Sequence, residues 1–215
     1  MNMNTIKNAF SSTVIGISIV YMAYILMFIL MFSFGAMSTW DVFEVKRDSL
    51  TYDPIPFLVV ATFPMIIGLI ALPIIFEWKF FNCNMKDLGL RVKSENKWVA
   101  NITYFIGGVL IICIIILNLQ TAFPVLVHYT VSCFGEELLF RGILQKRMTD
   151  NMNSIIAILL CAIIFSVGFH QDSNLVDNLI IRFPLGFILG LIYHKTKSLF
   201  PSTTLHLAYN MFVSI

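Results

Sequence analysis

Long stretches without charged residues alternate with short polar segments along this chain, and their lengths predict membrane-spanning helices. Segments 13–37 and 54–76 contain no Asp, Glu, Lys or Arg. A third uncharged stretch, 98–135, is too long for one crossing, because about 20 helical residues span a bilayer. We expect the polar segment 118–124, which ends in a proline, to divide it into two helices.

The apolar segments that follow complete the predicted bundle. We expect further helices over the approximate ranges 124–147, 154–170, 175–194 and 202–215. The predicted fold class is therefore all-α: a polytopic transmembrane helical bundle of about seven membrane helices, within a range of six to eight.

The composition is typical of a protein whose surface is largely in contact with lipid. Hydrophobic residues make up 58% of the chain and charged residues 12%, against roughly 25% charged residues in a soluble domain. The net charge of +2, with no basic face that carries interleaved aromatic residues, argues against a nucleic-acid partner. We expect a multi-pass integral membrane protein, in a bacterial cell membrane, with the lipid bilayer as its surroundings.

Basic residues between the predicted helices form three clusters that a seven-helix count places on one side of the membrane. The clusters are Lys79, Lys86, Arg91, Lys93 and Lys97; then Lys146 and Arg147; then Lys195 and Lys197. Because loops rich in Lys and Arg face the cytoplasm, we expect this side to be cytoplasmic.

The fourth predicted helix carries charged residues within a membrane-spanning segment. A charged side chain within a membrane helix costs about 2.5–3.5 kcal/mol on insertion scales, so such residues usually serve a function. Glu137 and Arg141 are four residues apart and share a helix face, which predicts an ion pair. Glu136 points roughly 100° away from Glu137 and is left to face another helix.

Two later helices carry further polar side chains. His170 ends the fifth helix. It lies about as far from the predicted turn at 150–153 as Glu136 does, roughly 26 Å against 21 Å. His206 and Asn210 project from one face of the seventh helix, where apolar surroundings demand polar partners. Counting from the helix ends places His206 nearer the cytoplasm than Glu136. The two can meet only if the hairpin of the fourth and fifth helices protrudes.

These helices would bring together a carboxylate, two imidazoles and a carboxamide. A glutamate and a histidine can hold and deprotonate a water molecule, and a histidine and an asparagine can donate hydrogen bonds to a developing oxyanion. Those are the groups that hydrolysis of a peptide bond requires.

The ordered set EExxxR, a histidine and HxxxN resembles the motifs EExxxR, FxxxH and HxxxN of the CPBP intramembrane proteases, also called the CAAX protease and bacteriocin-processing (Abi) family. The matching residues are Glu136, Glu137 and Arg141, then His170, then His206 and Asn210. The second motif departs from the family pattern, because Phe165 precedes His170 by five residues and Ser166 stands in the expected position. The resemblance covers roughly residues 120–215.

The resemblance implies an intramembrane endopeptidase with the catalytic residues Glu136, His170, His206 and Asn210. Glu136 would activate water that His170 helps to position, and His206 with Asn210 would stabilise the oxyanion. Glu137 and Arg141 would support the fourth helix. We favour a mechanism without a cofactor or metal; the alternative is zinc held by Glu136, His170 and His206, although the chain contains no HExxH motif.

The resemblance also implies a division of the chain and a class of substrate. Residues 1–119 would form N-terminal transmembrane helices with a cytoplasmic loop, and residues 120–215 the catalytic helical core, within one membrane domain. The substrate would be a hydrophobic or prenylated peptide or protein. The reaction would serve CAAX-type processing, or bacteriocin processing and self-immunity.

Other interpretations of the same residues remain open. A non-catalytic family member or a small ion- or proton-coupled transporter could use the same buried polar cluster, although the chain shows no repeated halves. We interpret His128 as a core histidine and expect Arg182 to pair with Asp177 or Asp172. The four cysteines have no metal-ligand spacing and are expected to be reduced packing residues.

Overall fold

The computed structural model describes residues 3–38, 54–117, 122–168 and 174–214, and these parts of the chain are almost entirely helical. The elements are α1 (Met3–Ser38), α2 (Pro54–Phe57), η2 (Leu58–Thr62), α3 (Phe63–Met65), η3 (Ile66–Ala71), α4 (Leu72–Phe81), α5 (Lys97–Leu117), α6 (Ala122–Glu137), η4 (Leu138–Gln145), α7 (Lys146–Thr149), α8 (Ser154–Ile163), η5 (Ile164–Gly168), α9 (Leu175–Asp177), η6 (Asn178–Arg182), α10 (Phe183–Thr196) and α11 (Leu199–Phe212). The η elements are π-helical turns within longer helices.

Elements that follow one another without a break join into seven continuous helices within the described residues. Four of them are long and apolar enough to cross a membrane: Lys7–Met37, Pro54–Phe81, Lys97–Leu117 and Leu175–Thr196. Ser154–Gly168 is a shorter apolar helix. The predicted all-α, polytopic bundle is confirmed. Pro124 lies within the first turn of α6 instead of before it, where its missing N–H has no helical partner to lose.

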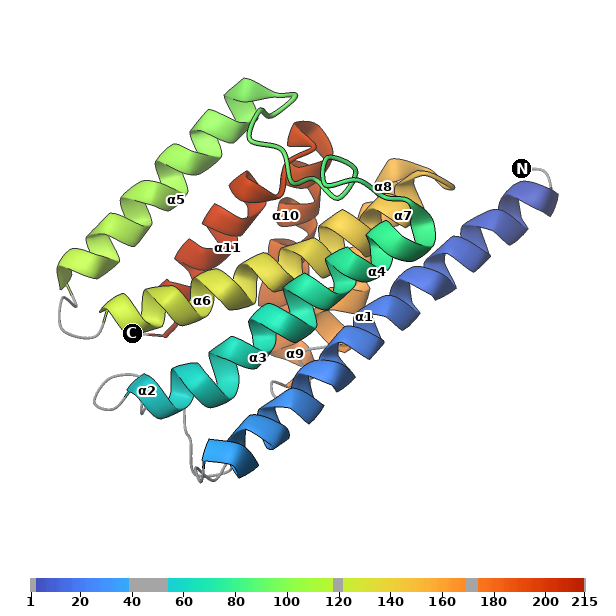
Figure 1. The fold of residues 1–215 in the computed structure, drawn as a ribbon. Helices are drawn as coiled ribbons and strands as arrows, with labels where there is room; N and C mark the ends of the chain where they lie inside the picture. Colours follow the sequence, from blue (N-terminus) through green and yellow to red (C-terminus); the bar gives the residue numbers. More distant parts are fainter. Residues whose placement is uncertain (1–2, 39–53, 118–121, 169–173, 215) are drawn as a thin grey trace.

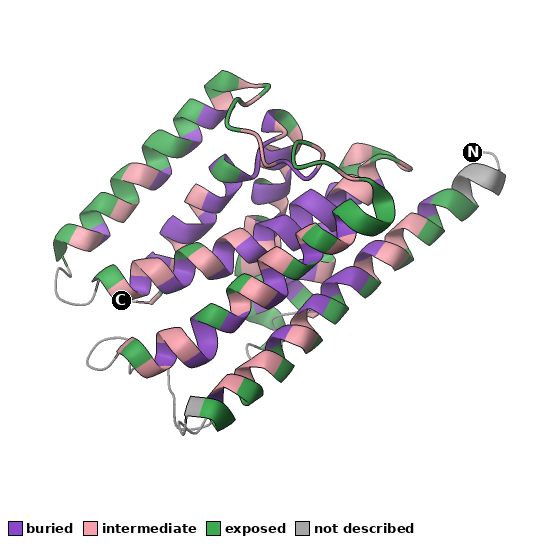
Figure 2. Ribbon diagram, viewed as in Figure 1, coloured by how far each residue is buried: buried purple, intermediate pink, exposed green. Residues whose placement is uncertain are grey.

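The helix from α6 through η4 to α7 runs through the middle of the bundle (Figure 1). On one side it packs against α11, which in turn packs against α5, and on the other it contacts the helix from α2 to α4 and α1. Buried residues concentrate on this central helix and on the faces turned toward it, whereas α1 and α5 expose much of their outer surface (Figure 2). Exposed apolar faces of this kind are typical of helices in contact with lipid.

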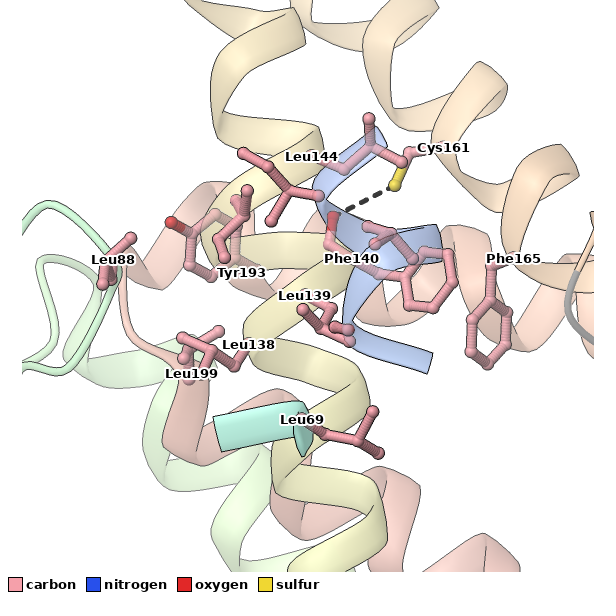
Figure 3. Packing of buried hydrophobic residues seen from close by; sticks show 14 of the residues in the cluster. Leu69, Leu88, Leu138, Leu139, Phe140, Leu144, Cys161, Phe165, Tyr193 and Leu199 are labelled. Carbon is pink, nitrogen blue, oxygen red and sulfur yellow. Dashed lines mark hydrogen bonds between the residues drawn. The ribbon is translucent and has the colours of Figure 1, made fainter. Parts of the chain in front are cut away.

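All eight residues of η4 are buried, so this part of the central helix is enclosed on every side. Leu138, Leu139, Phe140 and Leu144 reach in different directions, toward side chains from several other elements (Figure 3). The Cys161 thiol donates a hydrogen bond to the Phe140 carbonyl at 3.1 Å, which ties α8 to the central helix. The charged motif thus lies within the main core of the molecule.

Residues 82–96, between α4 and α5, are not helical and pack against one end of the bundle. The N–H of Leu199 donates to the Gly89 carbonyl at 2.9 Å, and the N–H of Glu95 donates to the Thr196 carbonyl at 2.9 Å. Gly89 has a φ of +80°, and a Cβ there would lie 2.6 Å from the Tyr193 ring, so only glycine fits. These contacts bring the basic clusters of this segment and of the α10–α11 junction to the same end.

The same segment explains how Glu136 and His206 come to the same depth. A Cβ on Gly142 would lie 2.6 Å from the Leu88 carbonyl oxygen, so the central helix touches residues 82–96 at Gly142. The first residue of α11, Leu199, touches them at Gly89. The beginning of α11 is therefore level with the middle of η4, not with the end of the central helix.

Beyond Gly142 the central helix continues for seven residues to Thr149, roughly 10 Å at 1.5 Å per residue. The hairpin that it forms with α8 therefore extends past the level at which α11 begins. This is the protrusion that the sequence requires if His206 and Glu136 are to meet.

Candidate active site

The central helix buries an ion pair between two motif residues. The Nε atom of Arg141 lies 3.3 Å from Oε2 of Glu137, and both side chains are fully buried. Arg141 also donates a hydrogen bond from Nη1 to the Cys161 sulfur at 3.6 Å, and its guanidinium lies over the Phe165 ring, 5.2 Å from the ring centre. The predicted pair is confirmed. A buried charge without such partners would cost several kcal/mol.

His206 of α11 connects the two glutamates of the central helix. Its Nδ1 atom lies 3.1 Å from Oε1 of Glu137, and its Nε2 atom lies 3.8 Å from Oε2 of Glu136. The imidazole is 2% exposed, so its orientation is set by these carboxylates and by packing. The histidine thus meets Glu137 as well as Glu136, a contact that the sequence does not predict.

Glu136 and Glu137 have different surroundings although they are neighbours. The Glu137 side chain is fully buried between Arg141 and His206, whereas the Glu136 side chain is 13% exposed. Ser132, one helical turn earlier, donates a hydrogen bond to Oε1 of Glu136 at 3.2 Å. Of the two carboxylates, Glu136 is the one that can meet a water molecule.

Glu136 lines a cavity of about 190 Å³ that is bounded by polar side chains from three helices. His206 and Asn210 reach it from α11, and Arg182 reaches it from η6. A space of this size holds several water molecules, since each occupies about 30 Å³ in the liquid. The structure therefore brings Glu136, His206 and Asn210 to one cavity.

Asn210 has an additional contact within the site. Its Nδ2 atom donates a hydrogen bond to the Cys133 sulfur of α6 at 3.2 Å. The amide has a second N–H, which this contact leaves for other acceptors. Asn210 lies four residues after His206, and both line the cavity, as their spacing on one helix face predicts.

His170, the remaining candidate catalytic residue, lies outside the described residues, which end at Gly168 on this helix. Its predicted level opposite Glu136 stays a prediction. The nearest described part of the second motif is Phe165, whose ring makes edge contacts with the rings of His206 at 5.8 Å and Phe140 at 5.1 Å. The phenylalanine therefore packs in the site despite its five-residue spacing from the histidine.

Several residues of the site carry no obvious signal in the sequence. Ser132 lies four residues before Glu136 and could have been found from that spacing, but nothing marks the two cysteines, Cys133 and Cys161, as partners of Asn210 and Arg141. All four cysteines are free thiols. Cys133 and Cys161 are buried, so for these two the expected packing role is confirmed and accompanied by hydrogen bonding.

His128 takes no part in this cluster. Its Nδ1 atom lies 2.9 Å from the Thr62 hydroxyl, and its ring makes an edge contact with Phe57 at 4.8 Å. It is a buried core histidine, as the sequence indicates.

The donor set for zinc is incomplete within the described part of the chain. No group of three His, Cys, Asp or Glu side chains among the described residues is arranged to hold a metal ion. Of the three candidate ligands, Glu136 and His206 present atoms 3.8 Å apart, and His170 is not described. Two ligands of one tetrahedral zinc lie about 3.4 Å apart, so a small movement of these two would suffice.

The fold and the cavity define a class of protein: a multi-helix membrane protein with a cluster of carboxylates and imidazole around a space that can hold water. Residues 118–212 match the family model described as type II CAAX prenyl endopeptidase, Rce1-like. The match confirms, for these residues, the resemblance to the CAAX protease family that the motifs indicate. Comparison with curated proteins and with solved structures gave no match.

Proposed function

We propose that this protein is an intramembrane endopeptidase that cleaves a peptide bond near the C-terminus of a hydrophobic or prenylated peptide or protein. The observation that carries the proposal is the meeting of Glu136, His206 and Asn210 at one cavity within the Rce1-like part of the chain. The name of that family, CAAX prenyl endopeptidase, indicates the substrate class, a C-terminal CAAX sequence whose cysteine is prenylated.

In the proposed reaction Glu136 is the general base. Its carboxylate takes a proton from a water molecule in the cavity, and the water oxygen adds to the scissile carbonyl carbon. The resulting oxyanion accepts hydrogen bonds from His206 and Asn210. Glu136 then returns the proton to the leaving nitrogen as the C–N bond breaks, so the products are a carboxylate and an amine.

The position of His206 specifies its protonation state in this scheme. Because Glu137 accepts a hydrogen bond at Nδ1, a hydrogen bond from Nε2 to the oxyanion requires a proton on both ring nitrogens. Oε1 of Glu137 and Oε2 of Glu136 lie 3.1 Å and 3.8 Å from the two ring nitrogens, so each nitrogen has an acceptor nearby. With Arg141, the cluster then holds two positive and two negative charges, which suits a buried site.

We propose that His170 positions the attacking water and that Phe165 serves as the phenylalanine of the second motif. Phe165 lies in the π-helical turn Ile164–Gly168. A π-helix bonds residue i to residue i+5 where an α-helix bonds i to i+4, so it accommodates one additional residue per turn. This additional residue accounts for a five-residue spacing in place of four.

The experiment is cleavage of a quenched fluorescent farnesylated peptide by purified protein in liposomes. Glu136→Gln removes the base at constant size, and we expect it to lower kcat by at least 100-fold, within the range for general-base catalysis. The matched control is Glu95→Gln, an exposed glutamate of residues 82–96 that pairs with Arg91. This variant should cleave at the wild-type rate.

Each outcome of this experiment bears on one part of the proposal. Wild-type cleavage that survives Glu136→Gln would contradict the assignment of the base. Activity lost with a chelator and regained with zinc would replace the metal-free mechanism by a zinc enzyme with Glu136 and His206 among its ligands. If neither the farnesylated peptide nor its unmodified counterpart is cleaved, the proposed substrate class is wrong.

A further inference from the structure

Arg182 lies on the wall of the cavity that holds the candidate catalytic residues. It ends η6 within Leu175–Thr196, one of the four candidate membrane spans. A guanidinium within such a span is costly unless it meets a partner or a polar cavity. Its side chain lines the same space as Glu136, His206 and Asn210. A positive charge is thus presented to the space in which the substrate would react.

The two arginines of the central helix, Arg141 and Arg147, pair with buried carboxylates, whereas Arg182 belongs to another helix and lies at the wall of the cavity. Arg141 is fully buried against Glu137. The Nη2 atom of Arg147 donates a hydrogen bond to each carboxylate oxygen of the buried Glu77, both at 2.7 Å. Arg182 is half-buried and faces a cavity.

A partner on its own helix does not exhaust the hydrogen-bonding capacity of Arg182. The sequence suggests Asp177 or Asp172 as such a partner; Asp172 lies outside the described residues, and the Asp177 carboxylate accepts a hydrogen bond from Asn174 at 2.8 Å. A guanidinium carries five N–H donors in a planar fork, so one acidic partner leaves donors for a second carboxylate. The cavity is where such a second carboxylate can bind.

We infer that Arg182 binds the free C-terminal carboxylate of the substrate. The inference rests on the proposed function, because a protease that trims a C-terminal sequence acts within a few residues of that carboxylate. An extended chain advances about 3.3–3.6 Å per residue, so the three residues that follow the cysteine of a CAAX end place the carboxylate roughly 10 Å from the scissile bond. Arginine and carboxylate form paired, charge-assisted hydrogen bonds, which strengthen where water is excluded.

This role would give the site a preference for chain ends over internal bonds. A peptide that ends in a carboxamide, or that continues beyond the cleavage sequence, offers the guanidinium an uncharged group in place of a carboxylate. A neutral acceptor forms weaker hydrogen bonds with a guanidinium than a carboxylate does, so such a peptide gains less from Arg182. Arg182 is therefore a substrate-binding residue that selects for a free C-terminus.

The test measures binding in a protein that does not turn the peptide over. In the Glu136→Gln background, reconstituted in lipid nanodiscs, two fluorescently labelled farnesylated peptides of one sequence are compared, one a free acid and one a carboxamide. We expect the free acid to bind at least 10-fold more tightly. Arg182→Gln should abolish that difference while leaving carboxamide binding unchanged, and Arg182→Lys should retain part of it. The control Arg91→Gln, on the exposed pair outside the cavity, should retain all of it.

Three results would overturn the inference. The Glu136→Gln protein could bind both peptides equally, or the preference for the free acid could persist after Arg182→Gln. Arg182→Gln could also abolish binding of both peptides, which would mark the arginine as structural. Because binding does not depend on turnover, this experiment distinguishes failure of the inference from failure of the proposed function. Wild-type protein that binds the free acid through Arg182 but does not cleave it would refute the protease and retain the carboxylate site.

Discussion

The Nδ1 atom of His206 lies 3.1 Å from Oε1 of Glu137, across the contact between α11 and the central helix. This contact turns the opposite ring nitrogen, Nε2, toward Glu136. A buried carboxylate that holds one side of an imidazole fixes both its orientation and its proton positions. Glu137 therefore links the Arg141 ion pair to the histidine of the site.

Replacement of Glu137 by glutamine should damage both stability and activity. Arg141 would lose its buried counter-charge, at a cost of about 3–5 kcal/mol. The ring of His206 would lose its fixed orientation, and we expect kcat to fall by about 100-fold or more. Thermal unfolding in detergent and cleavage kinetics measure the two effects separately. The double variant Glu137→Leu/Arg141→Leu should recover much of the stability and none of the activity; a Glu137→Gln protein with wild-type kcat would contradict the role of this contact.

Gly142→Ala should separate the central helix from residues 82–96. The new Cβ would lie 2.6 Å from the Leu88 carbonyl oxygen, so the backbone there must move, at a cost of about 1–3 kcal/mol. Gly108→Ala on α5 is the matched control, because its Cβ would meet no atom within 4 Å. That control should unfold at or slightly above the wild-type temperature. Equal unfolding temperatures for both variants would show that the close contact at Gly142 is absent.

Phe165→Ala should destabilise the site from the side of α8 and η5. The ring contacts Phe140, His206 and the guanidinium of Arg141, so its loss leaves a cavity and should cost about 3–5 kcal/mol. Phe105→Ala on α5 removes the same atoms from an exposed position and should have little effect. Thermal unfolding gives the comparison. A smaller loss for Phe165→Ala than for Phe105→Ala would exclude a packing role for Phe165.

The thiol of Cys83, in the segment between α4 and α5, should react slowly at neutral pH. Burial raises its pKa above the usual value, and the nearby Glu77 carboxylate raises it further, while Lys146 and Arg147 partly offset the rise. A raised pKa leaves less thiolate at a given pH, so alkylation should stay slow until the pH exceeds 9. Mass spectrometry of the Cys83 peptide after timed alkylation gives the profile. A midpoint at or below pH 9 would contradict this placement.

The sequence predicts the fold well because its strongest signals are local. The lengths of uncharged segments predict seven helices, and the four-residue spacing of Glu137 and Arg141 predicts their pair. His128 is likewise assigned to the core from its apolar surroundings. Each of these predictions depends only on the order and spacing of residues within one helix.

The remaining features of the site depend on contacts between helices that are distant in the sequence. The bond from His206 to Glu137 requires the register of α11 against the central helix, and no spacing within either helix specifies it. The position of Arg182 at the cavity and the contact of Cys161 with Arg141 likewise depend on how distant helices pack. A π-helical turn also shifts every following residue around its helix, which no simple periodicity anticipates.

The carbonyl of Gly89 accepts the first backbone hydrogen bond of the helix that carries His206 and Asn210, yet Gly89 lies far outside the matched residues 118–212. During synthesis, residues 82–96 are made before α11, so the segment that the first residue of α11 contacts precedes it on the chain. A fragment limited to 118–212 would hold every motif residue and still lack the carbonyl that accepts the N–H of Leu199 at the start of α11. The part of the chain without the motifs therefore supplies a contact at the start of the helix that carries two of the candidate catalytic residues.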